Sequence, residues 1–123
     1  MTTTTDTTTA GAQINAVGSL LALFTAHRGL PAPRITSERV VADERDASGN
    51  LTLTEGMTLA FHRDNSLADF EQWRQALGID PAGVDLSTTG CFAWLDVTTT
   101  HAGTPIRLVG YFELPESARD GER

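Results

Sequence analysis

Segments with helical periodicity alternate with pairs of strand-like segments along this chain, and this order limits the folds that it can adopt. Helices are predicted at 13–28 and at 66–77. Two segments with strand alternation follow each helix, at 34–43, 51–62, 91–99 and 105–114. In α+β domains, helices cover one face of an antiparallel sheet. We therefore expect an αββαββ order, with two helices packed on one face of a four-stranded, mainly antiparallel sheet.

The segments outside these elements are short and mostly polar. The 123 residues suit one domain and leave little room for a second. We expect a disordered, Thr-rich tail over 1–11, a single domain over 12–115 and a frayed tail over 116–123. Residues 83–89 are expected to form a loop with at most a short extended piece. Glu55 and Gly56 interrupt the alternation of their strand and predict a bulge.

The first helical segment has more apolar residues than one helix face needs. Its predicted buried stripe follows helical spacing. Leu23 lies beside that stripe, which makes this helix a candidate for burial on two sides. The predicted stripe consists of Ile14, Val17, Leu20, Leu21 and Phe24.

The second helical segment carries its own start and stop signals. Ser66 is a candidate N-cap, and Asp69 stands three residues later, where it would complete a capping box. Gly78 and Ile79 match a Schellman ending, in which a left-handed glycine is followed by an apolar residue that packs back on the helix. The predicted apolar face consists of Leu67, Phe70, Trp73 and Leu77.

The last two strands separate their side chains onto two unlike faces, because successive residues of a strand point to opposite sides. One face is small and aliphatic and suits a core under the helices: Ala93, Leu95, Val97, Ile106, Leu108 and Phe112. The opposite face carries Phe92, Trp94, Asp96, Thr98, Arg107, Val109, Tyr111 and Glu113. A solvated sheet face is normally polar, and an apolar patch marks a contact surface. Three occupants remain open: the chain's own segments, a second copy or partner protein, and a small molecule.

The candidate interface or ligand-binding residues follow from that second face: Phe92, Trp94, Asp96, Arg107, Val109, Tyr111 and the nearby His62. Asp96 and Arg107 stand on neighbouring strands and are predicted to form a cross-strand ion pair. A functional alternative has Arg107 holding a carboxylate with His62 as acid or base. We favour the structural ion pair.

Composition excludes several classes of function. The formal net charge is −7, and the nine basic residues, all Arg, are scattered, so binding to nucleic acid is disfavoured. The histidines His27, His62 and His101 lack the spacing of a zinc site. No phosphate-binding loop or nucleophile motif is present. We therefore predict no catalytic residue, no metal site and no cofactor.

The single cysteine, Cys91, rules out an internal disulfide and is expected to be a buried, inert thiol. The N-terminus lacks the basic region of a secretory signal. The longest apolar run, near 20–24, is too short to span a membrane. These features predict a cytoplasmic protein without membrane contact.

The segment from Ser66 to Ile79 resembles one in small actinomycete proteins of no known activity. The resemblance extends to the leading helix, to the link Leu30-Pro31-Ala32-Pro33 and to a closing hairpin with Gly110-Tyr111, and loosely covers 12–115. It implies an actinobacterial cytoplasmic protein and carries over no functional residue. Our hypothesis is a noncatalytic interaction module that forms a homodimer or docks a partner through the aromatic sheet face. The alternative is a small-molecule-binding protein or enzyme with a pocket on the same face.

Overall fold

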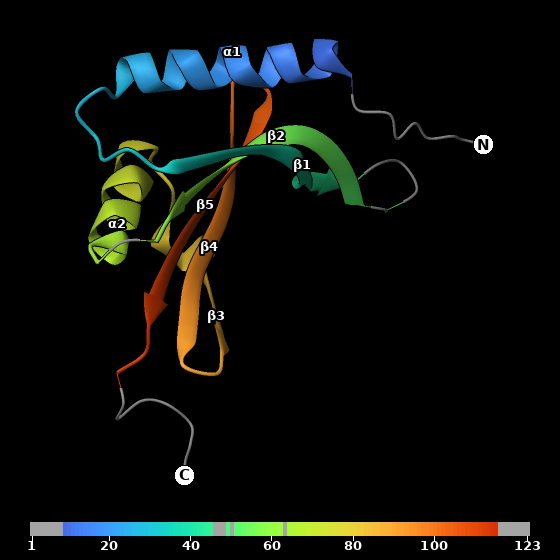
Figure 1. Ribbon diagram of the computed structural model, residues 1–123. Helices are drawn as coiled ribbons and strands as arrows, with labels where there is room; N and C mark the ends of the chain where they lie inside the picture. The colour runs from blue at the N-terminus through green and yellow to red at the C-terminus, as the bar shows by residue number, and fades with distance from the viewer. Residues whose placement is uncertain (1–8, 46–48, 50, 63, 116–123) are drawn as a thin grey trace.

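The computed structural model describes the backbone of residues 9–45, 49, 51–62 and 64–115, and the predicted tails lie mostly outside them. Two helices and five strands make up the domain (Figure 1). The helices are α1 (Ala10–Ala26) and α2 (Ser66–Ala76), and a short 3-10 turn spans Pro81–Gly83. The strands are β1 (Arg34–Arg45), β2 (Leu51–Phe61), β3 (Asp85–Thr89), β4 (Phe92–His101) and β5 (Thr104–Glu113).

The strands form one mixed sheet in the order β1-β2-β5-β4-β3. The α+β class and the two helices are confirmed, but the expected four-stranded αββαββ arrangement is wrong in detail. The segment expected to be a loop contains β3, which pairs with β4. Its one large apolar residue, Leu86, is exposed, so no burial alternation marks this strand in the sequence. The central pair, β2 and β5, is parallel, whereas the other neighbouring strands are antiparallel.

Both helices pack on the same face of the sheet. α1 lies across β1, β2 and β5, and α2 contacts β5 and β2 (Figure 1). The hydrophobic core lies between the helices and this face and contains Ala16, Leu20, Leu23, Met57, Leu59, Phe61, Phe70, Trp73, Val97, Ile106 and Leu108. The predicted division of the last two strands is therefore confirmed for Val97, Ile106 and Leu108. The opposite face is called the open face below.

α1 buries only part of the stripe that its spacing predicts: Leu20 is buried and Phe24 packs against the core, as predicted. Its buried residues are Ala16, Leu20 and Leu23. Ile14, Val17 and Leu21, which were expected in the core, are 67%, 50% and 68% exposed. Both triplets follow helical spacing, so periodicity alone cannot decide which one faces the sheet.

The helix starts also differ from prediction. α1 begins at Ala10, because the Thr9 side chain accepts a hydrogen bond of 3.1 Å from the Ala12 N–H. The N-cap of α2 is Asn65, which makes no side-chain capping bond. The Ser66 hydroxyl instead donates to the Tyr111 carbonyl of β5. The residue expected to cap α2 therefore attaches the helix to the sheet.

The predicted Schellman ending of α2 is confirmed. Gly78 has a φ of +70°. The Gly78 N–H donates to Gln75 and the Ile79 N–H donates to Arg74, both at 3.1 Å. Leu77 and Ile79 pack against the core beside this end.

The predicted bulge at Glu55 and Gly56 is wrong, because β1 and β2 pair there in continuous register.

Close packing within the domain requires glycine at two positions, Gly56 and Gly110. A Cβ at Gly56 would lie 2.4 Å from the Pro105 carbonyl oxygen, so only glycine fits. At Gly110 a Cβ would lie 3.0 Å from the Phe70 Cβ, which shows how closely α2 approaches β5.

No helix in the described part of the chain has both the length and the apolar character needed to cross a membrane.

Candidate functional site

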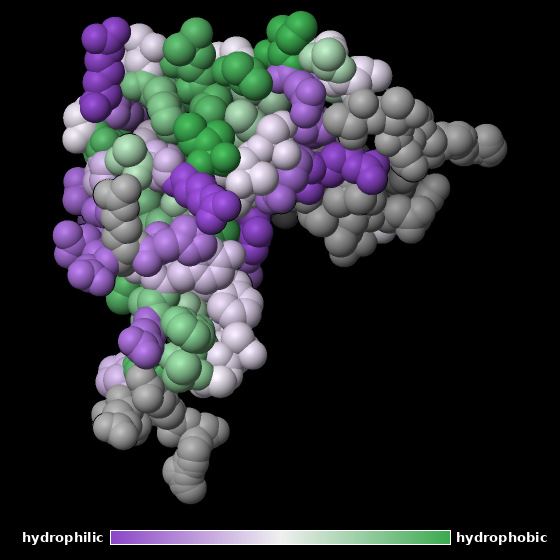
Figure 2. All heavy atoms as spheres, viewed as in Figure 1, coloured by the Kyte–Doolittle hydropathy of each residue, from purple (hydrophilic) through white to green (hydrophobic). Residues whose placement is uncertain are grey.

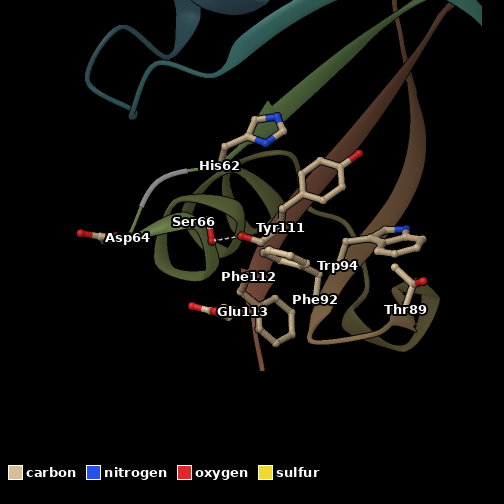
Figure 3. A pocket seen from close by; sticks show the side chains of 9 residues that line it. All are labelled: His62, Asp64, Ser66, Thr89, Phe92, Trp94, Tyr111, Phe112 and Glu113. Carbon is tan, nitrogen blue, oxygen red and sulfur yellow. Dashed lines mark hydrogen bonds between the residues drawn. The ribbon is translucent and has the colours of Figure 1, made fainter. Parts of the chain in front are cut away.

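An aromatic row crosses the open face where β2 ends. The last pair between β2 and β5 joins Phe61 to Gly110, and β5 continues beyond it to Glu113. His62 therefore comes level with Tyr111. Their rings stack with centroids 4.6 Å apart and planes within 12° (Figure 3).

Trp94 extends this row onto β4. It pairs with Tyr111 in the antiparallel ladder. The two ring centroids are 6.1 Å apart and the planes are tilted by 41°. Three rings from the end of β2, from β5 and from β4 thus form one continuous wall.

This wall borders a groove of about 640 Å³. Phe92 stands two residues before Trp94 on the same face of β4 and is 53% exposed, whereas Trp94 and Tyr111 are half-buried. The groove is lined by His62, Asp64, Ser66, Thr89, Phe92, Trp94, Tyr111, Phe112 and Glu113 (Figure 3). Four of the seven predicted site residues therefore meet in one concave surface: His62, Phe92, Trp94 and Tyr111.

The groove offers polar groups at the tips of its rings. Neither the Trp94 indole N–H nor the Tyr111 hydroxyl makes a hydrogen bond with the described residues. The two acidic residues of the lining, Asp64 and Glu113, lie on the α2 side with their carboxylates pointing away from the rings (Figure 3). No Arg is among the described residues that line the groove.

The other three predicted site residues lie elsewhere on the open face. The Arg107 guanidinium donates two hydrogen bonds to the Asp96 carboxylate, at 3.0 and 2.6 Å. This confirms the predicted cross-strand ion pair. The hydrogen bond to Asp96 is the main cause that raises the pKa of Arg107, while burial acts in the opposite direction. Val109, expected in the exposed patch, is fully buried, because it stands between this pair and Tyr111 in a curled sheet.

The curl of the sheet closes the centre of the open face. The edge strand β1 contacts β5 and β4 as well as its neighbour β2. Glu38 of β1 accepts a hydrogen bond from Thr58, and its negative charge contributes to the raised pKa of Arg107. The centre is therefore a cluster of partly exposed polar groups that bond to one another, and the aromatic part of the open face is the groove.

The remaining candidates are dispersed. His27 lies at the end of α1 with its ring 6.1 Å from Trp73, and His101 lies at the end of β4. Cys91, expected to be buried on a strand, is half-buried in the turn between β3 and β4. Arg63, which stands between His62 and Asp64 in the sequence, lies outside the described residues. Within the described ranges no group of three or more His, Cys, Asp or Glu residues is close enough together to hold a metal ion.

Sequence reasoning missed several residues of the groove. Ser66 was expected to cap α2 and Phe112 to lie in the core, whereas both line the groove. Their position arises because β5 extends three residues, Tyr111 to Glu113, beyond its last pair with β2. The register of a strand with a partner distant in sequence leaves no signal in local alternation. Among the missed residues, only Glu113 had been assigned to the open face from the alternation of its strand.

Comparison with protein families, with curated proteins and with solved structures finds no match to this chain.

Proposed function

We propose that this protein is a noncatalytic interaction module whose aromatic groove accepts an Arg or Lys side chain from a segment of a partner protein. The observation that carries the proposal is the row of His62, Tyr111 and Trp94 along a groove that is open to solvent. Aromatic rings attract a cation through the negative charge density of their faces, by about 0.5–2 kcal/mol for each contact.

The shape of the groove favours an inserting partner over a second copy of the same face. A two-fold interface places the same patch on both sides, so the patch must fit itself. Two concave surfaces do not fill each other, whereas an extended side chain fills one of them. For this reason we place a partner's side chain in the groove and do not propose homodimerisation through this face.

Charge favours a basic occupant. The chain carries a formal net charge of −7, and its field draws positive partners toward it. Asp64 and Glu113 add negative charge at the α2 side of the groove, with their carboxylates turned away from the rings, and the described lining contains no Arg to repel a cation. The Tyr111 hydroxyl can accept a hydrogen bond from a guanidinium or ammonium group.

The polar residues of the open face support binding more than chemistry. Arg107 is held by both Asp96 oxygens and does not line the groove, so the alternative in which it grips a substrate carboxylate lacks an available guanidinium. One face of the His62 imidazole stacks on the Tyr111 ring, and the residue is exposed. We therefore assign it a contact role.

Isothermal titration calorimetry with three peptides of equal length tests this proposal: hexa-arginine, hexa-citrulline and hexa-glutamate. Citrulline has the shape of arginine without its charge. We expect binding of hexa-arginine alone at physiological salt, weakening as salt rises. Replacing Trp94→Ala should lower the association constant by roughly 5- to 30-fold, since about 1–2 kcal/mol of ring contact is lost.

Leu86→Ala is the matched control, because Leu86 is an exposed apolar residue of the same sheet outside the groove. It should bind hexa-arginine as the wild type does. Equal binding of hexa-citrulline, or undiminished binding by the Trp94→Ala variant, would overturn the proposal.

A small molecule is the second candidate occupant. The groove volume of about 640 Å³ falls within the range of roughly 300–1,000 Å³ that is typical of small-molecule pockets. A thermal-shift screen of small aromatic and cationic compounds tests this alternative. A compound that raises the unfolding midpoint of the wild type, but not of the Trp94→Ala variant, would favour it over a protein partner.

A further inference from the structure

A second apolar surface lies on α1, on the side turned away from the sheet. Ile14, Val17 and Leu21 stand there at 67%, 50% and 68% exposure, spaced as neighbours on one helix face. Ile35, on the helix side of the neighbouring strand β1, is 45% exposed. Hydrophobic side chains gather over α1 and the strand below it (Figure 2). A helix that is apolar on two sides is normally covered on both.

The helix carries no charge. None of the 17 residues of α1 is Asp, Glu, Lys, Arg or His, although 20% of the chain is charged. The outer face of a solvated helix normally bears charged residues. A neutral face is also one that a second copy can approach without like-charge repulsion, despite a net charge of −7 on each chain.

Gly18 occupies the centre of this helix, with eight residues on either side, Ala10–Val17 and Ser19–Ala26. Glycine inside a helix is less stable than alanine. At Gly56 and Gly110 close packing within the domain requires the missing Cβ, but a Cβ at Gly18 would meet nothing within 4 Å. The domain itself therefore gains nothing from Gly18, whereas a neighbouring helix could approach closely there.

We propose that two copies of this chain associate through the outer faces of α1, with the helices antiparallel and crossing at Gly18. Antiparallel packing about a two-fold axis brings the middle of each helix together, which is where Gly18 stands. Ile14 and Val17 of one copy then pack on Leu21 and its surroundings in the other.

The segments of this chain outside the described residues contain few apolar side chains. In sequence, 1–8, 46–48, 50, 63 and 116–123 contain Met1 and two alanines as their only apolar residues. These sequences therefore supply little apolar surface that could cover Ile, Val and Leu, whereas a second copy presents the same neutral, apolar outer face of α1.

The available area predicts a weak dimer. A 17-residue helix is about 25 Å long and about 10 Å wide. Pairing one such face from each copy covers about 500 Å² in total, to which Ile35 and the flanking side chains add, and this is below the roughly 1,200–2,000 Å² of stable specific interfaces. We therefore expect association at micromolar concentrations rather than an obligate dimer.

Sedimentation velocity from low to high micromolar concentration tests this proposal. The wild type should shift toward twice the mass of one chain, and Leu21→Asp should stay at the mass of one chain with unchanged circular dichroism. Leu86→Asp, which places the same charge at a residue 62% exposed on β3, is the matched control and should still form the dimer. A wild type that stays monomeric, or a Leu21→Asp variant that dimerises equally, would overturn the proposal.

A cross-link locates the interface independently of the fold of the Leu21→Asp variant. In a Cys91→Ser background, Ile14→Cys is mixed with Leu21→Cys, because antiparallel α1 helices crossing at Gly18 bring Ile14 of one copy near Leu21 of the other, and Gly18 itself stays unchanged. Leu86→Cys, which places one thiol on β3, is the control. Mild oxidation of the mixture should give a disulfide-linked dimer that joins the two variants, and Leu86→Cys should give none. Equal cross-linking of the mixture and of Leu86→Cys, or none in the mixture, would overturn the assignment to α1.

Discussion

The outer face of α1 and the aromatic groove are both apolar and exposed, yet they differ in shape, charge and chemistry. The α1 face is convex, aliphatic and free of charge across all 17 residues of the helix. The groove is concave, aromatic and edged by two acidic residues. A convex neutral face can fit its own copy, whereas a concave acidic groove fits a basic side chain that enters it.

The two surfaces also differ in their relation to stability. α1 exposes its outer stripe only because another stripe of the same helix is already buried in the core. The groove arises where β5 extends beyond the end of β2, and the His62, Tyr111 and Trp94 rings pack partly on one another there. Changes at the inner side of α1 should therefore affect folding, and changes at either exposed surface should affect association.

The largest expected effect separates the two sides of α1. Leu23 is fully buried and Leu21 is 68% exposed. Leu23→Ala should lower the free energy of unfolding by about 2–5 kcal/mol, because it leaves a cavity in the core. Leu21→Ala should change it by less than about 0.5 kcal/mol when measured at dilute protein. Urea denaturation of both variants at the same low concentration checks this, and equal losses would contradict the assigned orientation of α1.

Glycine substitutions sharpen the comparison further. Gly110→Ala should destabilise the domain by about 1–3 kcal/mol, because its Cβ would press on Phe70 at 3.0 Å. Gly18→Ala should stabilise the monomer by about 0.5–1 kcal/mol, because the site is open. Thermal unfolding at low concentration measures both. Destabilisation of the dilute monomer by Gly18→Ala would contradict an open environment around Gly18.

Groove substitutions should cost little stability. Phe92 is 53% exposed, so Phe92→Ala removes little buried surface and should lower the free energy of unfolding by about 1 kcal/mol or less. The same change should weaken hexa-arginine binding and leave the sedimentation of the chain unaltered. A loss of both binding and self-association would show that the two surfaces are not separate.

The smallest effect lies on α2 and depends on pH. Glu71 accepts hydrogen bonds from Arg74, which lower the pKa of the Glu71 carboxyl below its ordinary value. The contribution of this carboxylate is present above the pKa of the unfolded chain and is lost as the pH falls through the lower folded value. Glu71→Gln should therefore lose less stability than the wild type between neutral pH and pH 3. Parallel unfolding curves for the two proteins at both pH values would contradict this.

Part of this organisation was accessible from the sequence. Alternation assigned Trp94 and Tyr111 to the open face and Leu108 to the core, because the period of a strand is two residues. The Asp96–Arg107 pair followed from the same alternation across a tight hairpin.

Other features depend on contacts between distant segments. The burial of Val109 depends on the curl of the sheet, and the groove depends on the register of β2 with β5. The orientation of α1 depends on which of two helical stripes meets the sheet. β3 has no buried face in its pattern and so left no signal of its own. None of these is encoded in the spacing of neighbouring residues.

The two tryptophans provide the most direct test of the proposed cationic occupant. Trp73 is buried and its indole N–H donates to the Pro31 carbonyl at 2.7 Å, whereas Trp94 lines the groove and its indole N–H has no partner among the described residues. In an amide and indole NMR spectrum of the full chain, addition of hexa-arginine at physiological salt should move the Trp94 signal and leave the Trp73 signal in place. A stationary Trp94 signal, or an equal shift with hexa-citrulline, would contradict the account.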